Sequence, residues 1–400
     1  MEGQREIERV ARESYGRLVA FLAADTHDLQ EAEDLLADSV AAALQRWKRD
    51  GIPKSPEAWL LSVARRKHVD LIRRRGIQSE VIEKLSIDPT DTRQSVNPDR
   101  RLQLLFLCAH PDIEPKTQTP LMLNVIFGFS ARDISGPFFL SPSAMSQRLV
   151  RAKKKIKDLK LKWEMPCPAQ FPSRLGAVLD SIYCAFGLGW DDIAGAESSG
   201  TAMSDEAIWL TRFLLKTLPH EPEVMGLMAL MLYSHARRAA RIGAGGEFVP
   251  LNEQDMDLWN IPMMDEADSF LAKAGAYQRP GPYQLEACIQ AAHAERRLTG
   301  HPNWEAILKF YDSINQSAPT MGSRVSQAGA YLAAGRTAKA KTTFDQLCPD
   351  QYKAYQPYWV LKANLEQLEN HSEAAMKAAS IAIGLTESAP IKKYLKAKFL

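Results

Sequence analysis

Apolar residues recur at helical spacing along almost the whole chain, and this periodicity limits the possible folds more than any other feature. Runs of alternating Val, Ile and Thr, which favour strands, are nearly absent, whereas Ala and Leu are abundant. A chain of 400 residues is also too long for one compact core. We therefore predict an all-α protein of several domains.

Breaks in the helical pattern divide the chain. Helices are predicted over 5–23, 29–48 and 56–75, so that residues 1–76 form a first domain. Residues 77–99 are rich in Asp, Ser, Thr and Pro and predict a linker. Helical periodicity resumes over 100–162, and a Pro-containing stretch over 163–170 predicts a second linker.

The remaining half is a long series of predicted helices, with an extension over 171–300 and repeats over 301–400. The helices of this half are expected over 171–187, 203–217, 222–240, 255–275, 282–297 and 303–316. Near the end, apolar and mostly small residues recur at an offset of 35: Ala328, Ala340 and Leu347 align with Ala363, Ala375 and Ala382. A period of about 34 residues is typical of tetratricopeptide repeats. An irregular helical array is the alternative.

Composition and cysteine spacing exclude several classes. The chain is 46% hydrophobic and 24% charged, as expected of a folded, non-membrane protein. Its 5 cysteines form no Cys-x-x-Cys pair, so neither a disulfide framework nor a metal site is predicted. We expect no cofactor, no signal peptide and no membrane span, and a cytoplasmic location.

Charge is distributed unevenly. Residues 1–162 contain 28 Lys+Arg against 22 Asp+Glu, or about +6, and residues 163–400 contain 22 against 26, or about −4. A basic amino-terminal part is compatible with a polyanionic partner, although this excess alone decides nothing.

The helix predicted over 59–75 carries most of the basic residues that suggest nucleic-acid binding. Arg66 and Arg73 are seven residues apart, as are Lys67 and Arg74, so each pair lies on one face. Such a helix can follow a phosphate backbone. The alternative is a solvated surface in which Asp70 pairs with Arg73 or Arg74.

A second basic helix is predicted over 141–157, with Ser141 as cap and Pro142 in its first turn. Met145, Leu149 and Ile156 lie on its buried stripe. The other face has small polar groups at the start and cations after them, as a major-groove recognition helix requires. With a shorter helix beginning near Phe129, this predicts a helix-turn-helix.

These segments, in this order, resemble a known family. Residues 31–47 and 56–75 resemble region 2 of sigma factors of the extracytoplasmic-function group, and residues 100–157 resemble region 4. The segments over 220–241 and 279–295 and the repeat-like end are similar to the subgroup with a tetratricopeptide-like helical extension. The resemblance implies a bacterial transcription initiation factor that catalyses no bond formation itself.

The resemblance also assigns roles to residues. It implies that the clamp helices of the RNA polymerase β′ subunit would be contacted by Glu33, Asp34, Leu35 and Asp38. Contact with the promoter −10 element falls to Arg65, Arg66, Lys67, His68, Arg73 and Arg74. Reading of the −35 element falls to Ser143, Ser146, Gln147, Arg148, Arg151 and Lys154. The helical extension would regulate activity or bind a partner protein.

Two departures from the family pattern bear on this hypothesis. Gly136-Pro137 interrupts the supporting helix of the helix-turn-helix, where Pro costs about 3 kcal/mol, so this helix should end early or kink. Gly187-Leu188 replaces an Asn-Glu pair of the subgroup. The first departure favours an alternative, a scaffold protein with a degenerate sigma-like front. A second alternative is an enzyme housed in the 171–300 helices, because this half of the chain contains several acids together with His220, His235, His293 and His301.

Overall fold

The structure is a computed structural model, and it describes residues 7, 9–10, 13–74, 99–191 and 199–400. Within these ranges the regular elements are helices, and one isolated β-bridge joins Ile242 to Phe248. The predicted all-α fold is confirmed. None of the helices in the described ranges combines the length and the apolar character needed to span a membrane.

The chain divides into two compact units, residues 1–185 and 186–400. The first unit thus contains both segments that were predicted as separate domains over 1–76 and 100–162. The linker predicted over 77–99 falls almost entirely outside the described residues. The 163–170 segment contains a short 3-10 helix, η1 Pro168–Gln170.

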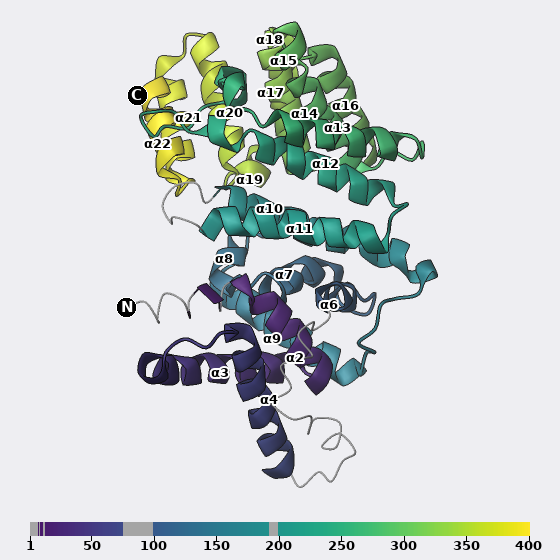
Figure 1. Cartoon of the computed structure of the whole chain (residues 1–400). Coiled ribbons are helices and arrows are strands. Elements are labelled where there is room, and N and C mark those ends of the chain that lie inside the picture. The colour runs from purple at the N-terminus through teal and green to yellow at the C-terminus, as the bar shows by residue number, and fades with distance from the viewer. Residues whose placement is uncertain (1–6, 8, 11–12, 75–98, 192–198) are drawn as a thin grey trace. The chain divides into compact units, whose positions relative to one another are not determined.

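In the first unit, the predicted helix starts and stops are largely observed (Figure 1). Its helices are α2 Tyr15–Thr26, α3 Leu29–Asp50, α4 Pro56–Arg74, α6 Arg101–Cys108, α7 Pro115–Val125, α8 Ala131–Ser135, α9 Pro142–Leu159 and the beginning of α10 Phe171–Asp191. The Asp28 carboxylate caps α3 by accepting from the backbone N–H groups of Gln30 and Glu31. Gly51, with φ of 84°, ends it.

The second unit is a series of helices with few intervening residues. They are α11 Ser199–Thr217, α12 Pro222–Ala236, η2 Arg238–Arg241, η3 Leu251–Glu253, η4 Met256–Leu258, α13 Ile261–Gly275, α14 Pro282–Ala294, α15 Arg296–Thr299, α16 Trp304–Ser317, α17 Met321–Ala333, α18 Thr337–Asp345, α19 Pro349–Tyr352, α20 Gln356–Leu368, α21 Ser372–Gly384 and α22 Ala389–Phe399. The helix predicted over 255–275 begins later, at Ile261, because Asn260 caps it and Pro262 occupies its first turn.

A buried arginine holds the irregular segment before α13. The guanidinium of Arg296 lies 5.3 Å from the Trp259 ring and donates hydrogen bonds to three backbone carbonyl groups. These carbonyl groups belong to Leu251, Asn252 and Gln254. One charged side chain therefore bonds to several carbonyl groups of a segment whose own backbone hydrogen bonds are those of two short 3-10 helices.

The offset of 35 residues found in the sequence recurs in the helices. The pair α17–α18 begins at Met321 and Thr337, and the pair α20–α21 begins 35 residues later in each case. All six aligned apolar residues are buried: Ala328, Ala340, Leu347, Ala363, Ala375 and Ala382. At the turns, Gly335 and Asn370 both have left-handed backbones, with φ of 74° and 61°. Asn370 thus takes the conformational role of Gly335, since Asn tolerates this region better than most residues.

Candidate nucleic-acid interface

The basic residues of α4 fall into two groups in the structure. Arg65 donates to Asp25 at 3.2 Å and lies over the Phe21 ring, and Lys67 lies 2.9 Å from Asp38. By contrast, the side chains of Arg66, Arg73 and Arg74 are exposed. The alternative pair of Arg73 with Asp70 is long, at 4.0 Å, and exposed, which makes it weak. An accessible cationic surface therefore remains on α4, while Arg75 lies outside the described residues.

His68 occupies a different environment from the one that a DNA contact requires. Its ring is buried, and Nδ1 lies 3.0 Å from Oε1 of Glu31 in α3. In this conformation His68 belongs to the core between α3 and α4 and faces Glu31. Its assignment to the −10 contact stays a prediction.

The residues assigned to polymerase docking also include both exposed residues and residues that are buried or already paired. Asp34 and Asp38 are exposed on α3, whereas Leu35 is buried in the core of the unit. Both carboxylate oxygens of Glu33 accept from Lys153 Nζ, at 2.7 and 2.6 Å. Leu35 therefore supports α3 from within, and Glu33 is already paired in this conformation.

The start of α9 has the arrangement that the sequence predicts. Ser141 caps the helix by accepting from the N–H of Ala144 at 3.2 Å. The apolar stripe is buried. Five of the six assigned residues are exposed, namely Ser143, Ser146, Gln147, Arg151 and Lys154. The sixth, Arg148, is half-buried and donates to the carbonyl of Lys116 in α7 at 3.4 Å.

The helix before α9 ends early, at the point where Gly136-Pro137 predicts it. Helix α8 has 5 residues, Ala131–Ser135, and Ser130 and Asp133 form a capping box at its start. The turn that follows contains Phe139, whose φ is 53° and whose side chain is 57% exposed. A bulky residue in the left-handed region is strained, and here no burial of the ring compensates for it.

This strain gives a stability prediction. Substituting Phe139→Gly should raise the free energy of unfolding of the first unit by about 1 kcal/mol, because glycine adopts positive φ without a steric penalty. Hydrogen exchange of amides over 131–159 in the full chain measures the effect, and slower exchange is expected. Faster exchange would show that the exposed ring stabilises the turn.

One family model and one relative show which family the chain belongs to. Residues 10–77 match the sigma-70 region 2 family, and residues 174–275 match a family of unknown function (DUF6596). An uncharacterized protein of Rhizobium meliloti (strain 1021) is 36% identical over 302 residues, which cover 73% of this chain and 71% of that protein. The chain belongs to the same family as this protein and carries a sigma-70 region 2. No solved structure matches the chain significantly.

The sigma-70 region 2 match coincides with α2, α3 and α4, the elements that position the cationic surface of α4 and the exposed acids of α3. The sequence did not predict two polar contacts made by acidic residues of this region. Tyr15 of α2 donates to Glu33 at 3.1 Å, and Lys157 of α9 lies 2.6 Å from Asp28. The spacing of Lys153 and Lys157 places both on one face of α9, but nothing in the sequence indicates which acids face them.

The histidines behind the enzyme alternative have separate environments in the second unit. His220 Nδ1 lies 3.1 Å from the Tyr277 hydroxyl, and His235 Nε2 lies 3.3 Å from Asp205. His293 is packed edge-on against the Trp304 ring, with ring centroids 5.4 Å apart. Burial, together with Arg237 and Arg296 nearby, lowers the pKa of His293 to about 4. A buried neutral imidazole of this kind supports packing more readily than proton transfer at neutral pH.

The pKa of His293 predicts acid sensitivity of the second unit. Because the folded-state pKa lies below the usual value of 6.5, the unfolded chain binds the proton more tightly. The stability contributed by the neutral ring is fully present above about pH 6.5 and is lost as the pH falls towards 4, by roughly 3 kcal/mol in total. Denaturant unfolding across this range measures it, and His293→Phe should remove this part of the slope. An unchanged slope in that variant would contradict the assignment.

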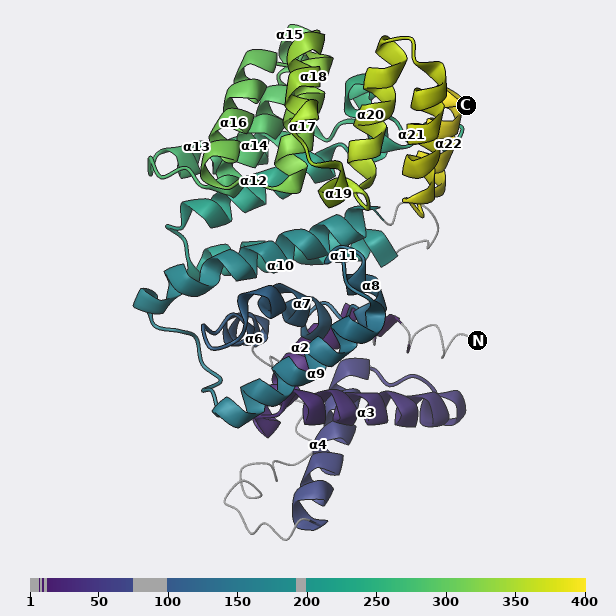
Figure 2. The ribbon, with the colours of Figure 1, turned by 180° about the vertical axis from the view of Figure 1, so that it is seen from behind.

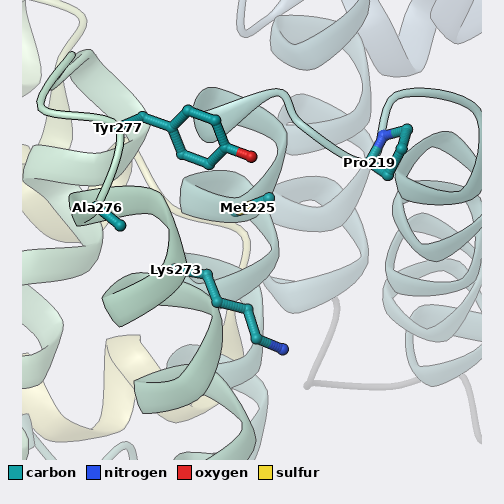
Figure 3. Close-up of a pocket in the computed structure, with 5 residues that line it drawn as sticks. All are labelled: Pro219, Met225, Lys273, Ala276 and Tyr277. Carbon is teal, nitrogen blue, oxygen red and sulfur yellow. The ribbon is translucent and has the colours of Figure 1, made fainter.

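The second unit also contains a shallow cavity of about 390 Å³. It is lined by Pro219, Met225, Lys273, Ala276 and Tyr277 (Figure 3). One ammonium and one phenol at an open, largely apolar surface lack the convergent polar groups of a catalytic site.

An exposed group of Glu366, Glu369 and His371 has ligand atoms close enough to hold a metal ion. Lys341 already pairs with Glu369 there, and surface acids often cluster without binding an ion. The group therefore adds no metal site to the proposals below.

Proposed function

We propose that the chain is a bacterial transcription initiation factor of the extracytoplasmic-function group, acting in the cytoplasm without catalysing a reaction itself. The observation that supports this most is the coincidence of the sigma-70 region 2 match with helices that present an exposed cationic surface. Asp34 and Asp38 on α3 would contact the clamp helices of the polymerase β′ subunit. Arg66, Arg73 and Arg74 on α4 would contact the −10 element.

Region 4 is the second part of the proposal. The exposed residues at the start of α9 would read the −35 element in duplex DNA, while the cations after them would contact phosphates. The supporting helix is short, so the approach of α9 to the groove would differ from that in relatives with an uninterrupted helix. Ser143, Ser146, Gln147 and Arg151 would make the base contacts, because N-terminal residues of a recognition helix reach base edges.

Reconstitution with core RNA polymerase tests the proposal. Purified chain should co-elute with bacterial core enzyme and direct initiation from promoter fragments selected by the reconstituted complex from a random library. Co-elution without promoter selection would support the scaffold alternative, which the 5-residue α8 favours. Absence of co-elution would reject both.

The helical extension is proposed to regulate activity or to bind a partner through its tetratricopeptide-like hairpins. The recurrence of α17–α18 in α20–α21 supports a repeat architecture, and such arrays present extended surfaces to peptides. A truncated chain should retain residues up to Ala185, because the Phe171 ring packs on Phe106 and Arg174 donates to the Phe106 carbonyl within the first unit. Altered initiation by this truncation is expected, and unchanged initiation would reject a regulatory role.

A further inference from the structure

Helix α9 has two stripes of residues on opposite sides. The buried stripe recurs at intervals of four, three and four residues: Met145, Leu149, Ala152 and Ile156. The same intervals, begun two residues earlier, give a fully exposed stripe: Ser143, Gln147, Val150 and Lys154. A shift of two residues is a rotation of about 200° around an α-helix. The exposed stripe therefore points directly away from the core, and Figure 2 shows α9 along one side of the first unit.

Val150 is an unexpected residue in the middle of the exposed stripe. It is 58% exposed, whereas Gln147 and Lys154, its neighbours on the stripe, are polar or charged. A β-branched apolar residue is a weaker helix former than Lys or Gln, so helix propensity does not account for it. Single exposed apolar residues are common on protein surfaces. What distinguishes Val150 is its place among the residues proposed to contact the −35 element.

The groups around Val150 have the chemistry of a surface that fits the major groove. Gln147 precedes Val150 by three residues and Lys154 follows it by four, so both lie next to it on the helix surface. A glutamine can bond to both N6 and N7 of adenine, and a lysine can contact phosphates or guanine. The apolar group that base edges present in the major groove is the C5 methyl group of thymine. An apolar side chain in this surface therefore has one matching partner.

The spacing along α9 also fits neighbouring bases. Three helical residues rise about 4.5 Å, and successive base pairs are about 3.4 Å apart. Gln147 and Val150 would therefore reach the same base pair or adjacent ones. An A·T pair presents the adenine N7 and N6 groups and the thymine methyl group together in the major groove, so an amide beside an apolar side chain is complementary to it.

We propose that Val150 contacts the C5 methyl group of one thymine in the −35 element and thereby sets a preference for thymine over cytosine at that position. Cytosine lacks the methyl group and presents an amino donor, which valine cannot accept. This inference rests on the proposed function and adds a sequence preference to it. It assigns a role to a residue that charge and polarity do not mark as a DNA contact.

Removing the methyl group from the DNA tests the proposal without changing the protein. The probe is a promoter fragment that the full chain selects when assembled on core polymerase. Each thymine of its −35 element is replaced in turn by deoxyuridine, which pairs with adenine but lacks the methyl group. Fluorescence anisotropy measures the affinity. One replacement should weaken binding about fourfold, as expected for one methyl group returned to water, and the others should have little effect.

Val150→Ala completes a double-mutant cycle with this replacement. The thymine and deoxyuridine fragments should bind the variant equally, because both γ-methyl groups of Val150 are removed. Alanine is the better helix former and position 150 is exposed, so circular dichroism should show unchanged helix content. The matched control is Leu159→Ala, at an aliphatic residue of α9 that is 37% exposed but lies on the opposite side of the helix. This control should keep the fourfold sensitivity.

Several results would overturn the inference. They are a selected −35 element without thymine, and a set of deoxyuridine replacements that leaves the affinity unchanged. A deoxyuridine effect that persists in the Val150 variant also overturns it, because another group must then contact the methyl group. Promoter selection persists in all these cases, and the proposed function is retained. If the chain on core polymerase selects no promoter fragment, the proposed function fails and the inference fails with it.

Discussion

Replacing Arg66, Arg73 and Arg74 together by Ala should weaken DNA binding by about two to three orders of magnitude at low salt, at about tenfold for each lost phosphate contact. These three side chains are exposed on α4, whereas Arg65 and Lys67 already pair with Asp25 and Asp38. Each neutralised phosphate releases counterions, so the slope of log K against log salt should become shallower by about 2 to 3.

Binding is measured by fluorescence anisotropy with the chain assembled on core polymerase, over about 50 to 300 mM salt. Phosphate contacts carry no sequence information, so any fork-junction oligonucleotide serves. The matched control replaces Arg46, Lys48 and Lys54, which are exposed but lie on α3 and in the loop after it. An equal loss of affinity in this control would mean that net charge alone causes the effect. An unchanged salt slope in the α4 variant would reject α4 as the DNA-binding surface.

Arg296→Ala should have the largest effect on stability. Its guanidinium bonds to three backbone carbonyl groups and lies over Trp259, and the residue as a whole is 9% exposed. Removing it takes a charged donor from the buried Gln254 carbonyl and from two less buried carbonyl groups, and leaves a gap beside Trp259, at a cost of about 3 kcal/mol. For a unit of this size the melting temperature should fall by about 10 °C.

Calorimetry of the full chain measures this change, with Arg324→Ala on the exposed face of α17 as the control. The segment from Leu251 to Trp259 should become the first site of proteolytic cleavage in the Arg296 variant, because this arginine holds it. A loss below about 1 kcal/mol would mean that water replaces the guanidinium, and that the segment is held by its own packing.

Helix positions were predictable from sequence because local rules decide them. Pro56 and Pro142 start helices, Gly51 ends one, and Gly136-Pro137 shortens α8, each through its own backbone constraint. The 35-residue repeat was also visible, but the equivalence of Asn370 to Gly335 follows only from the positive φ that both adopt.

The candidate site was less predictable, because it depends on contacts between distant residues. Charge alone does not tell Arg66, which is exposed, from His68, which is buried against Glu31. Likewise, Lys153 and Lys154 are adjacent in sequence, yet Lys153 pairs with a residue 120 positions away and Lys154 is exposed. Such pairings follow from the packing of α9 on α3, which helical periodicity does not specify.

The burial of Cys108 has a practical consequence. This thiol is fully buried in α6, and burial raises its pKa, whereas Cys167 and Cys348 are exposed. A maleimide should therefore modify the two exposed thiols at once and Cys108 only during excursions that unpack the core. The rate of Cys108 alkylation, measured by mass spectrometry, therefore reports how often the core opens in the native chain. No substitution is needed for this measurement.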